Sequence, residues 1–172
     1  MERPEAENNR PGGGQPRRSA GLGYSGGDAR VILYLDASAL VKRYIQEKAS
    51  QDVNAWIEAA DMVVTGLISR VEVAAAIAHA GRMTLITPDE TFAALRQFRS
   101  EWESFHRLPI TENTAARGDA LAVEHNLRGY DATHLACALI WQETLGMPVI
   151  LASFDSQLIE AARGVQMAYL PA

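Results

Sequence analysis

The chain has 172 residues, of which 48% are hydrophobic, and this length and composition fit one domain with one buried core. No apolar run reaches the length of a membrane span, and the single cysteine, Cys137, excludes an internal disulfide. These features favour a protein of the reducing cytoplasm. The net charge of −5 argues against a broadly basic surface, although a cluster of four carboxylates would account for most of it.

Residues 1–29 are rich in glycine, proline and arginine and show almost no apolar periodicity, which predicts a disordered or non-native N-terminal extension. The twin arginine at 17–18 precedes no apolar stretch and so is not an export signal. The segment 21–26 matches G-x-G-x-x-G, but it neither follows a strand nor opens a helix, which argues against dinucleotide binding. Residues 30–172 are then the globular domain.

From Val31 onward, short apolar, β-branched runs alternate with helical patterns. Pro88 suits the first turn of a helix, and Gly146 followed by Pro148 suits a helix end. We expect strands at 31–35, 62–65, 149–152 and 165–169, and helices at 37–47, about 50–60, 70–81, 88–105, 112–126, 131–145 and 156–163. This alternation predicts an α/β protein, with a central parallel sheet covered by helices on both faces.

Four acidic residues stand where an apolar run gives way to a helical pattern: Asp36, Glu72, Asp131 and Asp155. Because ligands in open α/β sheets lie at the carboxyl ends of the strands, we expect the four carboxylates to meet at one rim. Crowded carboxylates repel one another, by about 1 kcal/mol per pair at 4 Å even in water. An all-oxygen cluster of this kind favours Mg²⁺ or Mn²⁺.

Each acid also has a purely structural interpretation. Ser69-Arg-Val-Glu72 matches a capping box, and Asp131 and Asp155 are each suited to cap the helix that follows. Asp36 is harder to explain in this way, because it directly follows five apolar residues. The structural interpretations weaken together, because all four acids occupy the same kind of strand-to-helix junction.

Four segments carry a family resemblance: Leu35-Asp36-Ala-Ser-Ala-Leu-Val-Lys42, Ser69-Arg-Val-Glu72-Val, Tyr130-Asp131-Ala-Thr-His-Leu-Ala136 and Ala152-Ser-Phe-Asp155-Ser-Gln-Leu158. In order and spacing they resemble the signature segments of PIN domains, and above all of VapC-type ribonuclease toxins. The resemblance covers residue 31 to the end. It implies a PIN-like three-layer α/β/α fold, RNA cleavage dependent on Mg²⁺ or Mn²⁺, a homodimer, and inhibition by a small antitoxin.

In this interpretation Asp36 and Asp131 hold a divalent ion, supported by Glu72 and Asp155 directly or through waters, and the ion activates a water that cleaves the phosphodiester. The hydroxyls of Ser38 and Ser153 are placed to orient a carboxylate or a water, with helix capping as the alternative for each. Basic residues beside three of the acids suit an approaching phosphate backbone: Lys42, Arg43, Arg70 and Arg128.

Other reactive side chains favour structural roles. His134 lies one turn from Asp131 on the same helix face, where we expect it to hydrogen-bond near the rim. Cys137 is expected to be buried. We expect packing or surface roles for the remaining histidines, at 79, 106 and 125, and core or interface roles for the tryptophans, at 56, 102 and 141.

Three functional classes follow. The first is an antitoxin-controlled, metal-dependent endoribonuclease, whose acidic rim would attract an antitoxin Arg or Lys and whose apolar faces near Leu40–Val41 and 50–60 would serve a dimer. The second is a PIN nuclease of RNA processing or DNA repair without an antitoxin. The third is a metal-dependent phosphatase or a domain whose acids only cap helices. Haloacid-type phosphatases place a second Asp where this chain has Ser38, which counts against that class.

Overall fold

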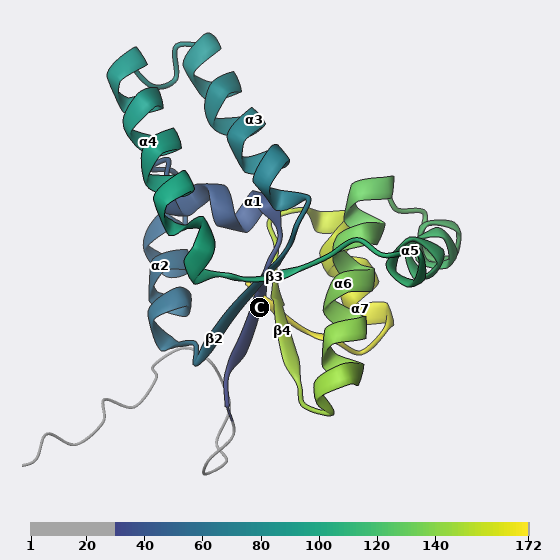
Figure 1. The fold of residues 1–172 in the computed structure, drawn as a ribbon. Helices are drawn as coiled ribbons and strands as arrows, with labels where there is room; N and C mark the ends of the chain where they lie inside the picture. The colour runs from purple at the N-terminus through teal and green to yellow at the C-terminus, as the bar shows by residue number, and fades with distance from the viewer. Residues whose placement is uncertain (1–29, 172) are drawn as a thin grey trace, which may run out of the picture.

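The computed structural model describes residues 30–171, which fold around a five-stranded, fully parallel sheet (Figure 1). The strand order is β3-β2-β1-β4-β5, so the first strand lies at the centre. The chain runs outward from this strand in both directions, which puts a crevice at the carboxyl end of β1. The strands are β1 Ile32–Leu35, β2 Met62–Gly66, β3 His106–Leu108, β4 Val149–Ala152 and β5 Ala168–Leu170.

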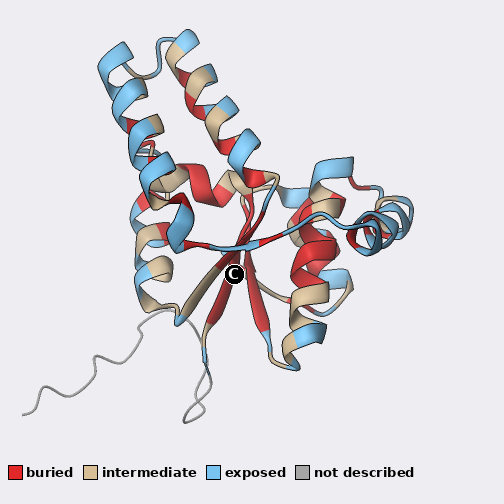
Figure 2. Cartoon of the chain, viewed as in Figure 1, coloured by how far each residue is buried: buried red, intermediate tan, exposed pale blue. Residues whose placement is uncertain are grey.

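Two cores lie on opposite faces of the sheet, because successive side chains of β1 alternate. Ile32 and Tyr34 pack on one side with residues of the three helices that lie between 112 and 164, while Leu33 and Leu35 pack on the other with residues of helices that lie between 37 and 101. All four β1 residues are buried, and in Figure 2 the central strands are largely buried while most exposed residues lie on the helices. The predicted three-layer α/β/α architecture is confirmed.

The helices cover both faces of the sheet, and most lie close to the predicted ranges. They are α1 Ala37–Leu40, α2 Ser50–Ala59, α3 Ser69–Arg82, α4 Pro88–Glu101, α5 Glu112–His125, α6 Gly129–Leu145 and α7 Ser156–Gly164. Pro88 lies in the first turn of α4 and Gly146 ends α6 in a left-handed conformation, as the sequence predicted. Thr87 and Glu90 also form a capping box at α4, which the sequence analysis had not predicted. None of the helices in this described part of the chain is long and apolar enough to cross a bilayer.

Three predicted elements were wrong in extent. The helix expected at 37–47 stops at Leu40 and is followed by a 3₁₀ turn over Val41–Arg43. Arg43 in this turn and the next residue, Tyr44, both hydrogen-bond Glu101 of α4. The helix expected at 88–105 ends at Glu101, and a 3₁₀ turn leads into the short edge strand β3, which the sequence analysis missed. The last strand begins at Ala168, later than predicted.

Residues expected to be structural are mostly found in the cores. Trp102 is fully enclosed, and Cys137 is buried with the pKa of its thiol raised to about 11 by desolvation. Trp56 stacks on Phe154, and Trp141 stacks on His106. The expectation of an N-terminal extension at 1–29 falls outside the described residues.

Candidate active site

The four acids predicted from the sequence line one pocket of about 270 Å³ at the carboxyl end of the sheet. Asp36 follows the central strand β1, Asp155 follows β4, and Glu72 and Asp131 come from the first turns of α3 and α6. Ser38 and His134 complete the polar lining. A larger pocket, of about 580 Å³, is lined by residues such as Arg43, Met62 and Phe105 and contains none of these acids. Chemistry, rather than volume, therefore identifies the site.

Asp36 is held by two serine hydroxyls from opposite ends of the sequence. Ser38 Oγ lies 2.8 and 2.9 Å from the two carboxylate oxygens, and Ser153 Oγ donates to Oδ2 at 2.6 Å. The Ala39 amide donates to Oδ1 at 2.8 Å, so Asp36 also caps the short helix α1. Ser38 and Ser153 thus orient the carboxylate, as the sequence analysis proposed, and neither serves as a helix N-cap.

The same two serines join α1 to the loop after β4. Ser38 Oγ accepts a hydrogen bond from the Phe154 amide at 2.8 Å, and Ser153 Oγ accepts one from the Asp155 amide at 3.0 Å. Asp155 accepts from the amides of Gln157 and Leu158 at 2.8 and 3.0 Å, so its expected capping of α7 is confirmed. The hydroxyls and amides together fix this side of the pocket with short hydrogen bonds.

Asp131 is not the N-cap that its structural interpretation required. Helix α6 begins at Gly129, so Asp131 lies within its first turn, and the N-cap Arg128 makes no side-chain capping bond. The element before α6 is the helix α5, so the expected strand-to-helix junction is also wrong for this residue. Asp131 reaches the pocket because its position in the first turn faces the carboxyl ends of the strands. A carboxylate there also suits the positive end of the helix dipole.

The capping-box interpretation of Glu72 is wrong. The N-cap of α3 is Ile68, without a side-chain cap, and Ser69 Oγ instead pairs with Thr65 Oγ1 at 2.7 Å. The Glu72 carboxylate lies 2.8 Å from His134 Nε2, so it turns toward α6 and the pocket. His134 is buried and hydrogen-bonded at the rim, as predicted. The partner on its other ring nitrogen, the Tyr34 hydroxyl, was missed because Tyr34 lies inside an apolar strand.

Two of the acids have raised pKa values. Burial raises the pKa of Asp36, against the lowering effect of its hydrogen bonds from Ser153, Ala39 and Ser38. Burial also raises the pKa of Asp131, and the negative charges of Asp155 and Asp36 raise it further. Ionising Asp36 or Asp131 in this pocket therefore costs free energy, and a cation placed among the carboxylates would offset that cost.

The donor set fits a hard divalent cation. All four acids offer carboxylate oxygens, which Mg²⁺ and Mn²⁺ prefer, and the pocket has room for the waters that Mg²⁺ retains. Within residues 30–171, no three acidic, histidine or cysteine side chains are placed as a ready-made set of ligands. Asp36, Glu72 and Asp155 already accept hydrogen bonds from neighbouring groups, so a cation would share their oxygens with those donors and would also contact Asp131 in the same pocket.

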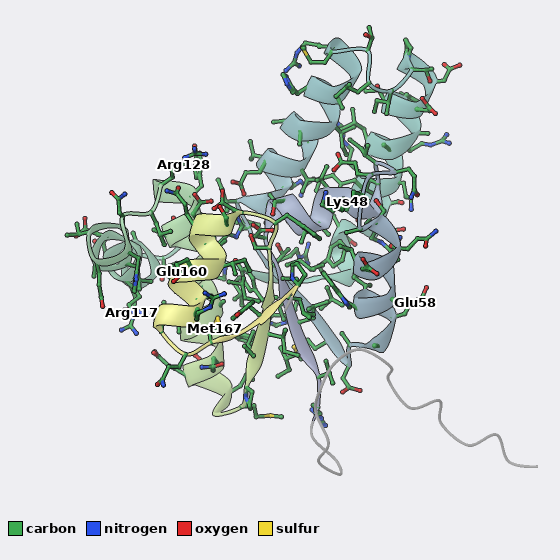
Figure 3. All side chains as sticks on the ribbon, turned by 180° about the vertical axis from the view of Figure 1, so that it is seen from behind. Lys48, Glu58, Arg117, Arg128, Glu160 and Met167 are labelled. Atoms are coloured by element: carbon green, nitrogen blue, oxygen red, sulfur yellow. The ribbon has the colours of Figure 1, made fainter. Side chains whose placement is uncertain are left out.

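The basic residues near the acids divide into two kinds. Lys42 pairs with Glu47 and Arg43 with Glu101, so both are committed to internal ion pairs. Arg70 and Arg128 are exposed, and Figure 3 shows Arg128 projecting from the helices toward solvent. Only these two match the expectation of a cation available to an approaching phosphate.

Comparison with known proteins agrees with this geometry. The PIN domain family model matches residues 33–164, and the chain therefore belongs to the PIN-domain family. It is 32% identical over 142 residues to Ribonuclease VapC45 of Mycobacterium tuberculosis, covering 82% of this chain and 96% of that one. It is 29% identical to Ribonuclease VapC3 of Pyrobaculum aerophilum, covering 74% of this chain and 92% of that one. Within the family, the chain is of the VapC type.

Solved structures share the fold. FitAB of the structure described as bound to an IR36 DNA fragment superposes with a TM-score of 0.58 at 18% identity, covering 81% of this chain and 94% of that one. PAE2754 from Pyrobaculum aerophilum superposes with a TM-score of 0.57 at 22% identity, covering 81% and 83%. At such low identity these likenesses concern the fold alone.

Proposed function

We propose that the chain is a metal-dependent endoribonuclease of the VapC type, the toxin of a toxin–antitoxin pair. One observation carries the proposal: four carboxylates from separate elements line a single pocket at the carboxyl end of a parallel sheet in a VapC-type PIN domain. Two of them have raised pKa values, which is the electrostatic cost expected of a site built for a cation.

In the proposed reaction, Asp36 and Asp131 hold Mg²⁺ or Mn²⁺, and Glu72 and Asp155 support it directly or through water. When bound, the cation supplies a lowered pKa for an attacking water and charge stabilisation at the phosphate. Ser38 and Ser153 keep both oxygens of Asp36 in a fixed orientation, so the carboxylate does not have to be ordered when the ion binds.

RNA reaches the pocket from the solvent side, where Arg70 and Arg128 are exposed. Their charges attract the phosphate backbone locally, even though the whole chain carries a net charge of −5. Such an enzyme acts in the cytoplasm and must be silenced. The proposed inhibitor is a small antitoxin whose Arg or Lys side chain competes with the cation for the pocket carboxylates.

The most direct test is sequencing of RNA ends after brief expression of the wild type and of Asp36→Asn. We expect new, discrete RNA ends with the wild type and none with the variant, because the variant lacks one carboxylate of the cation site. A control with Ser100→Ala, an exposed site on α4, should behave as the wild type. Identical ends from wild type and Asp36→Asn would contradict the proposal and show that cleavage does not need the Asp36 carboxylate.

The second candidate, a PIN nuclease of RNA processing or DNA repair, differs in its partner. Adding the product of an adjacent small reading frame to a cleavage assay separates the two. Inhibition supports the toxin, and a lack of inhibition by any adjacent small protein favours the second candidate.

We also propose a homodimer. The apolar face expected to serve it near Leu40–Val41 is buried within the domain, as is Val53 of the 50–60 segment, so that part of the prediction was wrong. Large apolar side chains stay exposed instead on α3, α4 and the turn between them, at Val71, Met83, Leu85 and Phe92. Light scattering of the purified chain should give the mass of two copies. A monodisperse monomer would exclude the dimer.

A further inference from the structure

His134 lines the acidic pocket and contacts two residues that are far away in the sequence. Its side chain is buried, with 2% exposure. Its Nε2 lies 2.8 Å from Glu72 Oε2, and its Nδ1 lies 2.9 Å from the Tyr34 hydroxyl. The three residues come from β1, α6 and α3, so one row of hydrogen bonds runs from the centre of the sheet to the rim.

The chemistry of the three groups determines which atom donates and which accepts in each hydrogen bond of this row. An ionised carboxylate only accepts hydrogen bonds, so the proton between His134 and Glu72 is on Nε2. In the neutral ring Nδ1 is then an acceptor, and the Tyr34 hydroxyl is its donor. Tyr34 is fully buried, and burial raises the pKa of its phenol well above the ordinary value, so the hydroxyl keeps its proton.

The backbone is shaped to leave room for this row. Gly66 ends β2 directly beside it, and a Cβ at that position would lie 2.9 Å from the Tyr34 hydroxyl oxygen and 3.6 Å from His134 Nδ1. The first of these distances is shorter than a carbon atom tolerates without displacement of its neighbour. The tyrosine and histidine therefore have a fixed place, defined by packing as well as by hydrogen bonds.

We propose that His134 is a positioning residue for Glu72, with Tyr34 keeping the ring proton on Nε2. The imidazole holds one carboxylate oxygen of Glu72 at the rim and leaves the other free of that bond. The role of Glu72 in the cation site thus depends on a hydroxyl buried in the central strand. The inference rests on the proposed cation site and adds the two residues that orient one of its carboxylates.

The test measures Mn²⁺ binding to the purified chain without RNA, from the loss of the free-ion EPR signal. We expect His134→Leu to weaken binding about 10- to 100-fold, the usual effect of removing a residue that orients a metal ligand. His134→Gln should recover most of the affinity, because its amide N–H₂ also donates to Glu72. Tyr34→Phe should give a smaller loss, because Nε2 remains close to Glu72.

Two controls separate positioning from general destabilisation. Ser50→Ala removes a buried hydroxyl that bonds Ile45 and Glu47 outside the pocket, so it should lower stability and leave Mn²⁺ affinity unchanged. Glu72→Ala combined with His134→Leu should be no weaker than Glu72→Ala alone, since His134 acts through Glu72. Wild-type affinity in His134→Leu would overturn the proposal, and so would an equal loss in His134→Leu and His134→Gln.

A second measurement does not depend on the metal. Two-dimensional ¹⁵N–¹H spectra of ¹⁵N-histidine-labelled chain identify which ring nitrogen carries the proton, and we expect Nε2–H for His134. A ring protonated only on Nδ1 would overturn the assignment. A wild type that binds Mn²⁺ but cleaves no RNA would contradict the ribonuclease proposal and leave the positioning role intact. A wild type without Mn²⁺ affinity would contradict both.

Discussion

The two sides of the acidic pocket are built differently. On the side of β1 and β4, Asp36 and Asp155 are fixed by hydroxyls and amides that stand within three residues of one acid or the other. On the side of α3 and α6, Glu72 depends on His134, which is 62 positions away, and His134 on Tyr34, which is 100 positions away. On the first side each acid has partners in its own local motif, and the bonds from Ser153 to Asp36 and from the Phe154 amide to Ser38 join the two motifs. The row of Glu72, His134 and Tyr34 on the second side consists of long-range bonds alone, so it forms only after the sheet and both helices have packed.

The difference predicts different consequences for mutation. Substitutions on the first side act directly on Asp36, which follows the central strand β1. Changes on the second side pass through a histidine and should be partly rescued by side chains that preserve its hydrogen bond. Four predictions test this comparison, and they follow in order of expected effect.

Asp36→Asn should reduce RNA cleavage to background while keeping the fold. The carboxylate is buried at 4% exposure and its pKa is raised, so its removal should leave the melting temperature unchanged or higher. Cleavage assays and thermal denaturation of the same preparation provide the measurement. A variant that unfolds, with unaltered activity per folded molecule, would show that Asp36 is structural.

Glu72→Gln should raise the Mg²⁺ or Mn²⁺ concentration needed for half-maximal cleavage, by about 10- to 100-fold for a ligand that acts directly or through water. Little change in melting is expected, because Gln can still accept the bond from His134 Nε2. Metal titrations of initial cleavage rates measure the shift. Full activity at ordinary metal concentration would remove Glu72 from the site.

The free energy of unfolding should depend on pH because of the crowded acids Asp36 and Asp131. Because the pKa values of Asp36 and Asp131 are raised from 3.8, the folded chain binds more protons than the unfolded chain between that value and the raised one. Their contribution to the free energy of unfolding therefore falls as pH rises through that interval, and it stays reduced at neutral pH. Denaturant unfolding with a chelator present should show a weaker decline for Asp131→Asn than for the wild type. Equal slopes would contradict the assignment.

The smallest of the four effects is expected at Asp155, and it concerns stability. Asp155→Ala removes the cap of α7 and should cost about 1 kcal/mol, whereas Asp155→Asn should be nearly neutral because Asn also caps well. Denaturant unfolding measures both. If Asn is as costly as Ala, the negative charge matters more to the folded chain than the capping bonds do. If Asn also lowers metal affinity, Asp155 contributes to the cation site as well as to α7.

The sequence was informative where partners are close along the chain. Asp36 with Ser38, and Ser153 with Asp155, stand two residues apart, so their association followed from spacing alone. The capping-box alternative for Glu72 failed, because Thr65 binds the Ser69 hydroxyl and His134 binds the Glu72 carboxylate. Tyr34 gave no signal, since its apolar body fits the strand pattern and its hydroxyl finds a partner only in the folded sheet. Edge strand β3 was missed because two of its three residues are exposed and polar.

Gly66 offers a way to disable the chain from outside its pocket. Any side chain at this position would collide with the Tyr34 hydroxyl, and the disturbance would reach the rim through His134 and Glu72. Cells that survive expression of the chain should therefore carry Gly66 substitutions alongside losses of the four acids. A genetic selection of this kind would show that the active site depends on a residue that has no reactive group of its own.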